Sequence, residues 1–358
     1  MKKRIVSIEL LRILSMMMVV MLHYLGKGGL LPQATDSMSL NGCLAWGMES
    51  LSIVAVNVYM IISGYFLVES AFKPSRVAEL VCQVLFYSIL VPVVLMAFGV
   101  LSPGEFTIHR ILENVLPVQM NHYWFITAYL IMYLLQPVLS TAAKTLQKEQ
   151  LKGTILALLF FFSVSKSVLP VELAVDQKGY DALWFICVFL VAAYMRLYGL
   201  SFFAERGSVR KGICCYLAGC AGIYGIMLAV RAVYLRTGSL DHFIGSTYHY
   251  NHVLNLFAAV ALFYAFYHMK INENGRFAGL ICRVAPHTLG VYLLHEQMDI
   301  RYLWPEWMGA TAEGSAVLFV IRSILTVLAV FAAGTLADMI RAKIFKIFRV
   351  FVGHRRLK

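Results

Sequence analysis

The sequence predicts an all-α polytopic membrane protein, and three observations support this fold class. Of the 358 residues, 60% are hydrophobic and only 14% are charged, whereas soluble proteins contain about 45–50% apolar and about 25% charged residues. Apolar segments long enough to span a bilayer recur along the whole chain. Basic residues cluster in the short stretches between these segments, which is typical of membrane topology. This combination excludes an ordinary soluble enzyme.

The apolar segments predict about ten transmembrane helices, since each span needs roughly 17–25 mostly apolar residues. The expected spans lie at about 6–25, 50–69, 78–99, 122–141, 153–170, 182–199, 212–235, 250–269, 279–297 and 315–340. Helix breakers such as Pro32, Pro74, Pro103 and Pro305 lie in the stretches between spans. None of these stretches is long enough for a second folded domain, so we expect residues 1–358 to form one membrane domain.

The distribution of positive charge tests the number of spans and predicts their orientation. With the N-terminus in the cytoplasm, 22 of the 31 Lys and Arg residues fall on the cytoplasmic side and 5 on the outer side. Cytoplasmic loops of membrane proteins carry such an excess of positive charge, so both termini are expected in the cytoplasm. Because the basic residues lie in these loops, the net charge of +12 does not indicate nucleic-acid binding.

The first predicted span carries three ionisable residues, and ionisable residues within a membrane indicate a functional site because their burial is unfavourable. At about 100° per residue, Arg12 and His23 point within about 20° of each other, and Glu9 points within about 40° of His23. Histidine is well suited to accept a hydroxyl proton near neutral pH. The alternative interpretations are an interfacial Glu9–Arg12 ion pair and a His23 ring bonded to a backbone carbonyl.

The second span and the stretch after it contain further candidates. Ser63 and Tyr65 lie within the span, although Ser63 and Gly64 could simply permit close helix packing. Lys73 and Arg76 follow at the end predicted to be cytoplasmic, where basic residues are also expected as topology signals.

Candidates in the later spans have equally simple alternatives. His122 and Trp124 open the fourth span, where an aromatic belt is common, and His295 ends the ninth span among ordinary interfacial residues. His249 and His252 could share a helical face, but no third ligand is evident, so no metal site is expected. The seven cysteines are odd in number and form no CxxC pair, so no disulfide framework is expected. Hydrolase, P-loop and metalloprotease motifs are also missing.

Four segments resemble the acyltransferase 3 family of integral-membrane acyltransferases. They are the acid–Arg–His pattern within residues 4–23, VNVYMIISGYFL at 56–67, the stretch from HYWF at 122–125 to YLLQP at 133–137, and LGVYLLH at 289–295. They follow one another in the family's order along most of the chain. Glu9 stands where the family commonly has Asp, and the basic stretch after the second span is sparser than in the family.

The resemblance implies transfer of an acyl group, usually acetyl, from acyl-CoA to a cell-surface or lipid-linked glycan. It implies His23 as the catalytic residue and Arg12, Lys73 and Arg76 as contacts of the donor. We expect Glu9, or another acid, to support His23. Substrate contacts are expected within the segments that carry the resemblance, at Ser63, Tyr65, His122, Trp124 and His295. Some family members carry an additional SGNH domain, and none is expected in this chain.

The helix geometry suggests how such a reaction would be arranged. Arg12 and His23 are separated by about 16 Å along a helix axis, roughly the reach of an extended pantetheine arm. The thioester could therefore reach His23 while the nucleotide of acyl-CoA stays cytoplasmic. His23 would then act as general base on an acceptor hydroxyl, and direct transfer is favoured over an acyl-histidine intermediate.

Two other functions remain open. A non-catalytic transporter or flippase for a lipid-linked glycan could use the same intramembrane charges, although broken helices in matching halves are not evident. An MBOAT-type acyltransferase would share the reaction but not these motifs. We expect a multi-pass protein of a bacterial inner membrane whose partners are lipid, acyl-CoA and a glycan, with no metal.

Overall fold

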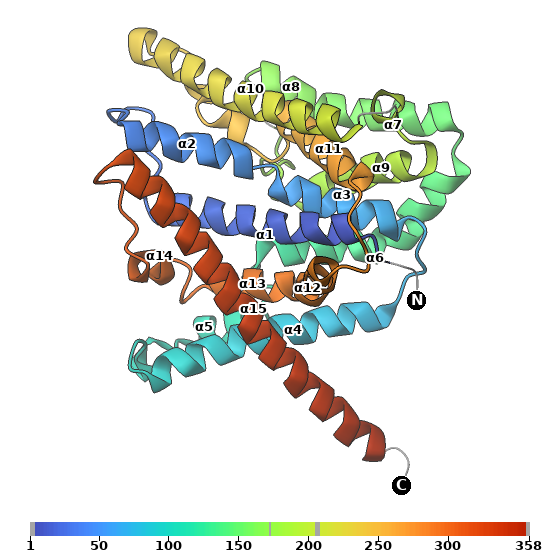
Figure 1. The fold of residues 1–358 in the computed structure, drawn as a ribbon, viewed down its shortest axis with the longest axis vertical. Helices are drawn as coiled ribbons and strands as arrows, with labels where there is room; N and C mark the ends of the chain where they lie inside the picture. Colours follow the sequence, from blue (N-terminus) through green and yellow to red (C-terminus); the bar gives the residue numbers. More distant parts are fainter. Residues whose placement is uncertain (1–3, 172, 205–207, 356–358) are drawn as a thin grey trace.

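The computed structural model describes residues 4–171, 173–204 and 208–355. This part of the chain consists of helices, turns and loops without a strand, so the predicted all-α fold class is confirmed. Most helices run roughly along one direction, and α15 crosses them obliquely (Figure 1). Five residues of the predicted cytoplasmic charge pattern lie outside the described residues: Lys2, Lys3, Arg206, Arg356 and Lys358.

The helix bounds in chain order are α1 (Val6–Lys27), α2 (Leu40–Ser52), α3 (Ala55–Leu67), α4 (Pro74–Ala97), α5 (Ile108–Val115), α6 (Trp124–Thr145), α7 (Lys148–Leu159), α8 (Ser165–Val168), α9 (Ala182–Tyr198), α10 (Ser208–Thr237), α11 (Val253–His268), α12 (Arg276–Val284), α13 (Thr288–His295), α14 (Leu303–Trp307) and α15 (Ala316–Arg355). Among the shorter helical turns, η6 (Ala285–His287) joins α12 to α13.

Eight helical segments of the described chain are long and apolar enough to cross a membrane, rather than ten. They are Val6–Lys27, Leu40–Leu67, Pro74–Ala97, Trp124–Thr145, Lys148–Val168, Val209–Thr237, Arg276–His295 and Ala316–Ile347. The two remaining predicted spans form the shorter helices α9 and α11, of 17 and 16 residues. Both helices begin at a side-chain cap, because the Asp181 side chain accepts from Trp184 N at the start of α9 and the His252 side chain accepts from Leu254 N at the start of α11.

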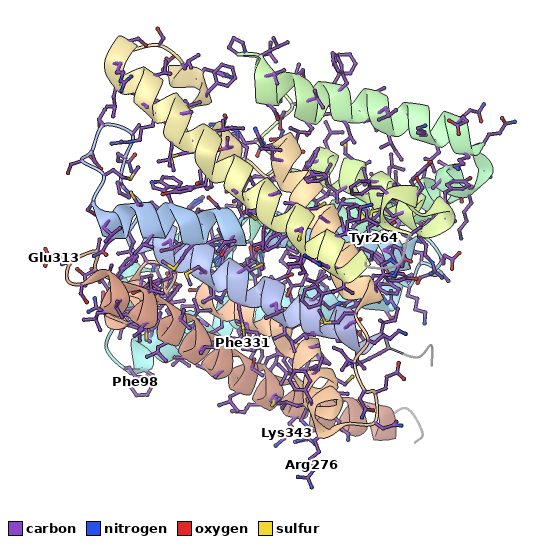
Figure 2. The ribbon with its side chains drawn as sticks, turned by 45° about the horizontal axis from the view of Figure 1, so that its top comes forward. Phe98, Tyr264, Arg276, Glu313, Phe331 and Lys343 are labelled. Carbon is purple, nitrogen blue, oxygen red and sulfur yellow. The ribbon has the colours of Figure 1, made fainter. Side chains whose placement is uncertain are left out.

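The start of α1 and the end of α15 lie at the same end of the bundle (Figure 1). We call this end the terminal end. Figure 2 shows Arg276 and Lys343 toward the terminal end, while Glu313, just before α15, lies at the opposite end. With the start of α1 and the end of α15 on one side, the arrangement agrees with the charge pattern, whereas the cytoplasmic orientation of that side remains a prediction.

Helix α1 is the central element of the core. Its Ile8, Leu11 and Leu22 belong to the apolar cluster formed with α3, α6, α9 and α11. Other α1 residues, including Met16 and Val20, belong to a second cluster with α4, α13 and α15. One helix therefore packs into both halves of the core, so a polar side chain on α1 can contact elements from either half.

Close packing around α3 depends on a small residue. A Cβ added at Gly64 would lie 2.9 Å from Ala192 Cβ and 3.1 Å from Phe189 Cα of α9. The packing role considered for Ser63–Gly64 therefore holds for Gly64, because glycine lets the two helices approach closely.

A fully buried carboxylate, Asp338 of α15, joins three elements at the terminal half of the bundle. It accepts hydrogen bonds from Tyr87 Oη of α4 at 2.9 Å, from Gln83 Nε2 of α4 at 3.1 Å and from Arg341 Nε at 2.6 Å. The Nδ1 atom of His287, in η6, lies 2.6 Å from the second carboxylate oxygen. Such a buried charge requires several partners, and these contacts supply them.

Gly290 of α13 packs directly against Asp338, and this contact generates a prediction. A Cβ at Gly290 would collide with the Asp338 carboxyl group. We expect Gly290→Ala to lower the free energy of unfolding by about 1–3 kcal/mol, as overpacking does, and by more if the Asp338 contacts break. The matched control is Gly279→Ala in α12, whose Cβ would meet no atom within 4 Å. Equal apparent melting temperatures of the two variants in detergent would contradict this prediction.

Candidate functional site

A cavity of about 340 Å³ lies between α1, α3, α4, α6 and the η6–α13 segment. It brings together five residues that were predicted from separate parts of the sequence. Arg12 and His23 come from α1, Ser63 from α3, Arg76 from α4 and Trp124 from α6. The remaining wall is mostly apolar and aromatic, with Tyr59, Phe125, Tyr129, Tyr133, Tyr250 and Tyr292 among its lining residues.

The cavity extends along α1 and differs chemically at its two ends. Arg76 lies in the first turn of α4, at the terminal end. His23 lies in the last turns of α1, and eleven residues separate it from Arg12, or about 16 Å of helix. The cations Arg12 and Arg76 therefore lie on one side of the cavity and the imidazole on the other.

The part of the cavity with Arg12 and Arg76 suits an anion, because these two arginines outnumber the single acidic residue among the described lining residues, Glu79. The Nε atom of Arg12 is buried and has no hydrogen-bond partner among the described residues. The Arg12 backbone is held in place, because Tyr59 Oη donates to its carbonyl oxygen at 2.6 Å. Arginine can donate charge-assisted hydrogen bonds to phosphate or carboxylate oxygens, so Arg12 has donor capacity available for a bound group.

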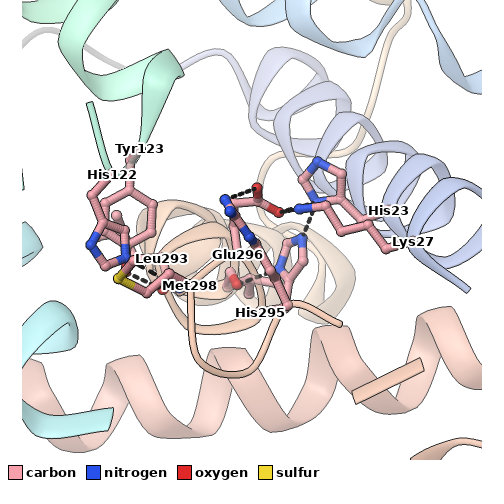
Figure 3. A network of polar contacts seen from close by, with 10 residues as sticks. His23, Lys27, His122, Tyr123, Leu293, His295, Glu296 and Met298 are labelled. Atoms are coloured by element: carbon pink, nitrogen blue, oxygen red, sulfur yellow. Dashed lines mark hydrogen bonds and ion pairs between the residues drawn. The ribbon is translucent and has the colours of Figure 1, made fainter. Parts of the chain in front are cut away.

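At the other end, His23 belongs to a polar network with the end of α13 (Figure 3). Its Nδ1 atom lies 2.9 Å from His295 Nε2 and 3.2 Å from Glu296 Oε2. Glu296 also forms an ion pair with Lys27, and Arg301 Nη1 lies 3.8 Å from its Oε1 atom. The side chains of His23 and Glu296 are 16% and 7% exposed, so this network is largely shielded from solvent. The Nδ1 edge of His23 is thus occupied by protein groups.

His295 was predicted to contact the substrate, but the structure places it outside the cavity lining. Its Nδ1 atom lies 2.6 Å from the Val291 carbonyl oxygen, and its Nε2 atom contacts His23. Both ring nitrogens are therefore engaged by the protein, and His295 is not among the residues that line the cavity. The structure makes it a neighbour of His23.

The predicted support of His23 by Glu9 is not found. The two residues lie on similar faces of α1, but fourteen residues separate them, which corresponds to about 21 Å along the helix. The acid beside His23 is Glu296. Helical periodicity correctly predicted that the two side chains lie on similar faces of α1, but residues on similar faces need not be neighbours.

Two further predicted site residues lie outside the cavity lining. Lys73 precedes α4 with an exposed side chain, and its backbone N–H donates to Tyr133 Oη at 3.2 Å. Tyr65 is 4% exposed and packs against Phe263 and Tyr267, with ring centroids 4.9 and 5.4 Å away. Tyr65 thus forms part of the core between α3 and α11.

His122 supports the loop that follows α13. Its Nε2 atom accepts a hydrogen bond from Met298 N at 3.2 Å, which leaves the hydrogen on Nδ1 to be donated to the Glu113 carbonyl at 3.3 Å. Burial lowers the pKa of His122, in agreement with a neutral ring that accepts at Nε2. Next to it, Tyr123 Oη donates to the Leu293 carbonyl at 2.9 Å (Figure 3). His122 therefore holds the segment around Glu296 rather than lining the cavity.

Sequence reasoning missed the residues that complete the His23 network, namely Glu296, Lys27 and Arg301. A concentration of ionisable residues at the end of the ninth predicted span and just beyond it was visible in the sequence. Ordinary interfacial charges produce the same pattern, and nothing in the sequence indicated that the end of this span packs against the first.

Comparison with known proteins gives a significant match to one protein family. No curated protein and no solved structure matches the chain significantly. The sequence does match the acyltransferase 3 family, described as an acyltransferase domain, over residues 5–337. This range is nearly the whole chain and includes every residue of the cavity lining. The chain therefore belongs to the acyltransferase 3 family and is a multi-pass membrane acyltransferase.

Proposed function

We propose that this protein transfers an acyl group, most simply acetyl, from acyl-CoA to a hydroxyl group of a cell-surface or lipid-linked glycan. The observation that carries the proposal is one cavity with two arginines on one side and a histidine on the other. Its volume of about 340 Å³ lies within the range of roughly 300–1,000 Å³ for small-molecule sites.

The arginines suit the phosphates of the donor. Phosphate groups are recognised by guanidinium through charge-assisted hydrogen bonds, and Arg12 has a buried Nε without a partner among the described residues. Arg76 lies at the terminal end, which is the side predicted to face the cytoplasm, where acyl-CoA is made. With the phosphates near these residues, the pantetheine arm would extend beside α1 toward His23.

His23 would act as general base. Its Nδ1 edge is occupied by His295 and Glu296, so Nε2 is the nitrogen available to an acceptor hydroxyl. As the proton moves to Nε2, the hydroxyl oxygen attacks the thioester carbonyl carbon. The new C–O bond forms, the C–S bond breaks, and the CoA sulfur leaves and takes up the proton from His23. The products are the acyl ester and free CoA.

The acceptor would approach from the end opposite the terminal end. Trp124 and Tyr250 line the cavity there, with ring centroids 5.6 Å apart, and aromatic faces are suited to stacking on the apolar face of a sugar ring. This arrangement supports an acceptor presented at the outer surface of a bacterial inner membrane, while the donor enters from the cytoplasm.

Binding of acetyl-CoA tests the donor site. A ligand that binds only the folded state stabilises it by about 2.7 kcal/mol at 100 times its Kd. We expect acetyl-CoA to raise the apparent melting temperature of the wild type and of His23→Ala in detergent, and to raise that of Arg12→Met much less. The matched control is Arg322→Met, because Arg322 is an arginine of membrane-spanning α15 that does not line the cavity. If no acyl-CoA shifts the wild type, the flippase function gains support instead.

Turnover tests the role of His23. General base catalysis contributes typically 10²–10⁴-fold, so His23→Ala should lose turnover by about this factor while it still binds acetyl-CoA. The measurement is CoA released from acetyl-CoA when purified protein is supplied with membrane glycans as acceptors. His109→Ala is the control, since its side chain is 71% exposed on α5. A folded His23→Ala protein with normal turnover would refute the proposed base.

A further inference from the structure

We infer that His295 and Glu296 are positioning residues for His23. They hold the imidazole proton on Nδ1, so that Nε2 carries the lone pair, and Glu296 stabilises the imidazolium that forms during acyl transfer. This inference rests on the proposed function, in which His23 is the base, and it assigns roles to two residues that do not line the cavity.

The hydrogen-bond partners determine which nitrogen carries each proton. The Val291 carbonyl can only accept, so His295 Nδ1, 2.6 Å away, must carry the hydrogen. In a neutral ring the other nitrogen is then an acceptor, so His295 Nε2 accepts. The atom that faces it at 2.9 Å is His23 Nδ1, which must therefore be the donor. One backbone carbonyl thus specifies the proton positions in two histidine rings.

Glu296 reinforces the same tautomer. Its Oε2 atom lies 3.2 Å from His23 Nδ1, and an ionised carboxylate can only accept. Lys27 and Arg301 pair with the same carboxylate, which limits its movement. The tautomer that carries its hydrogen on Nε2 would lose the hydrogen bond to His295 and would turn the lone pair of Nδ1 toward the Glu296 carboxylate.

The arrangement also supports the charged form of His23. When Nε2 takes the proton from the hydroxyl group of the acceptor glycan, the His23 imidazolium has two N–H groups. The one at Nδ1 already lies beside the Glu296 carboxylate. A carboxylate in this position orients a histidine base and stabilises its cation in nucleophile–base–acid arrangements generally. His295 and Glu296 are consecutive at the end of α13, so one helix end places both groups.

Turnover of Glu296→Gln tests the inference, since this variant keeps the side-chain shape and removes the charge. We expect kcat to fall at least about tenfold, a modest share of what general base catalysis contributes, with the acetyl-CoA thermal shift unchanged. Glu296→Asp keeps the charge and should recover part of the lost rate. The matched control is Glu306→Gln, an exposed position on α14 that should keep wild-type kcat.

A spectroscopic measurement reads the tautomer directly. In ¹⁵N spectra of histidine-labelled protein, His23 can be assigned by difference from a His23→Gln sample. The wild type should show His23 with its hydrogen on Nδ1, and Glu296→Gln and His295→Phe should move it toward Nε2. A wild-type His23 with its hydrogen on Nε2 would overturn the inference, and this result needs only the wild type and the His23→Gln sample used for assignment.

The outcomes separate the inference from the proposed function. If acetyl-CoA binds and His23→Ala is inactive, but folded Glu296→Gln keeps the wild-type kcat, the positioning role is wrong and the proposed function stands. If His23→Ala keeps normal turnover, the proposed base and the inference that depends on it both fail.

Discussion

The contact between the His23 ring and the end of α13 is the interaction on which the rest of the site depends. A membrane interior offers little water to a polar side chain, so an imidazole and a carboxylate placed there must find partners within the protein. His23 finds its partners in His295 and Glu296. Glu296 is in turn paired with Lys27 and Arg301. These contacts join the first helix to a segment more than 260 residues later, and they determine where the His23 ring lies in the cavity.

Helix α1 also determines the distance between the two chemical functions of the cavity. A rigid helix holds Arg12 and His23 about 16 Å apart on similar faces, so the cationic and basic regions cannot approach each other without breaking α1. Because α1 packs into both halves of the core, this separation is well supported. The proposed acyl-CoA donor, which has an anionic head and a reactive far end, suits this separation.

The opposite wall of the cavity is held by a second buried charge. The lining residues Ala285, Pro286, Thr288 and Leu289 flank His287, whose ring contacts the Asp338 carboxylate. Asp338 also binds Tyr87 and the cavity residue Gln83 of α4. One buried carboxylate thus fixes the wall formed by η6 and α13 relative to α4. Because Gly290 has no side chain, the Asp338 carboxylate fits against α13. The packing of the core therefore affects the shape of the cavity.

The sequence by itself determined the helical class of the protein and the face of α1 that carries Arg12 and His23, because apolar length and helical periodicity are local properties. It also identified Ser63, Arg76 and Trp124, which the structure brings into the same cavity. Tertiary structure decided which acid lies beside His23. Periodicity gave Glu9 the right direction but placed it about 21 Å away, whereas Glu296 reaches His23 only because α13 packs beside α1. Contacts between helices distant in sequence depend on how whole surfaces fit together, and no local pattern specifies that fit.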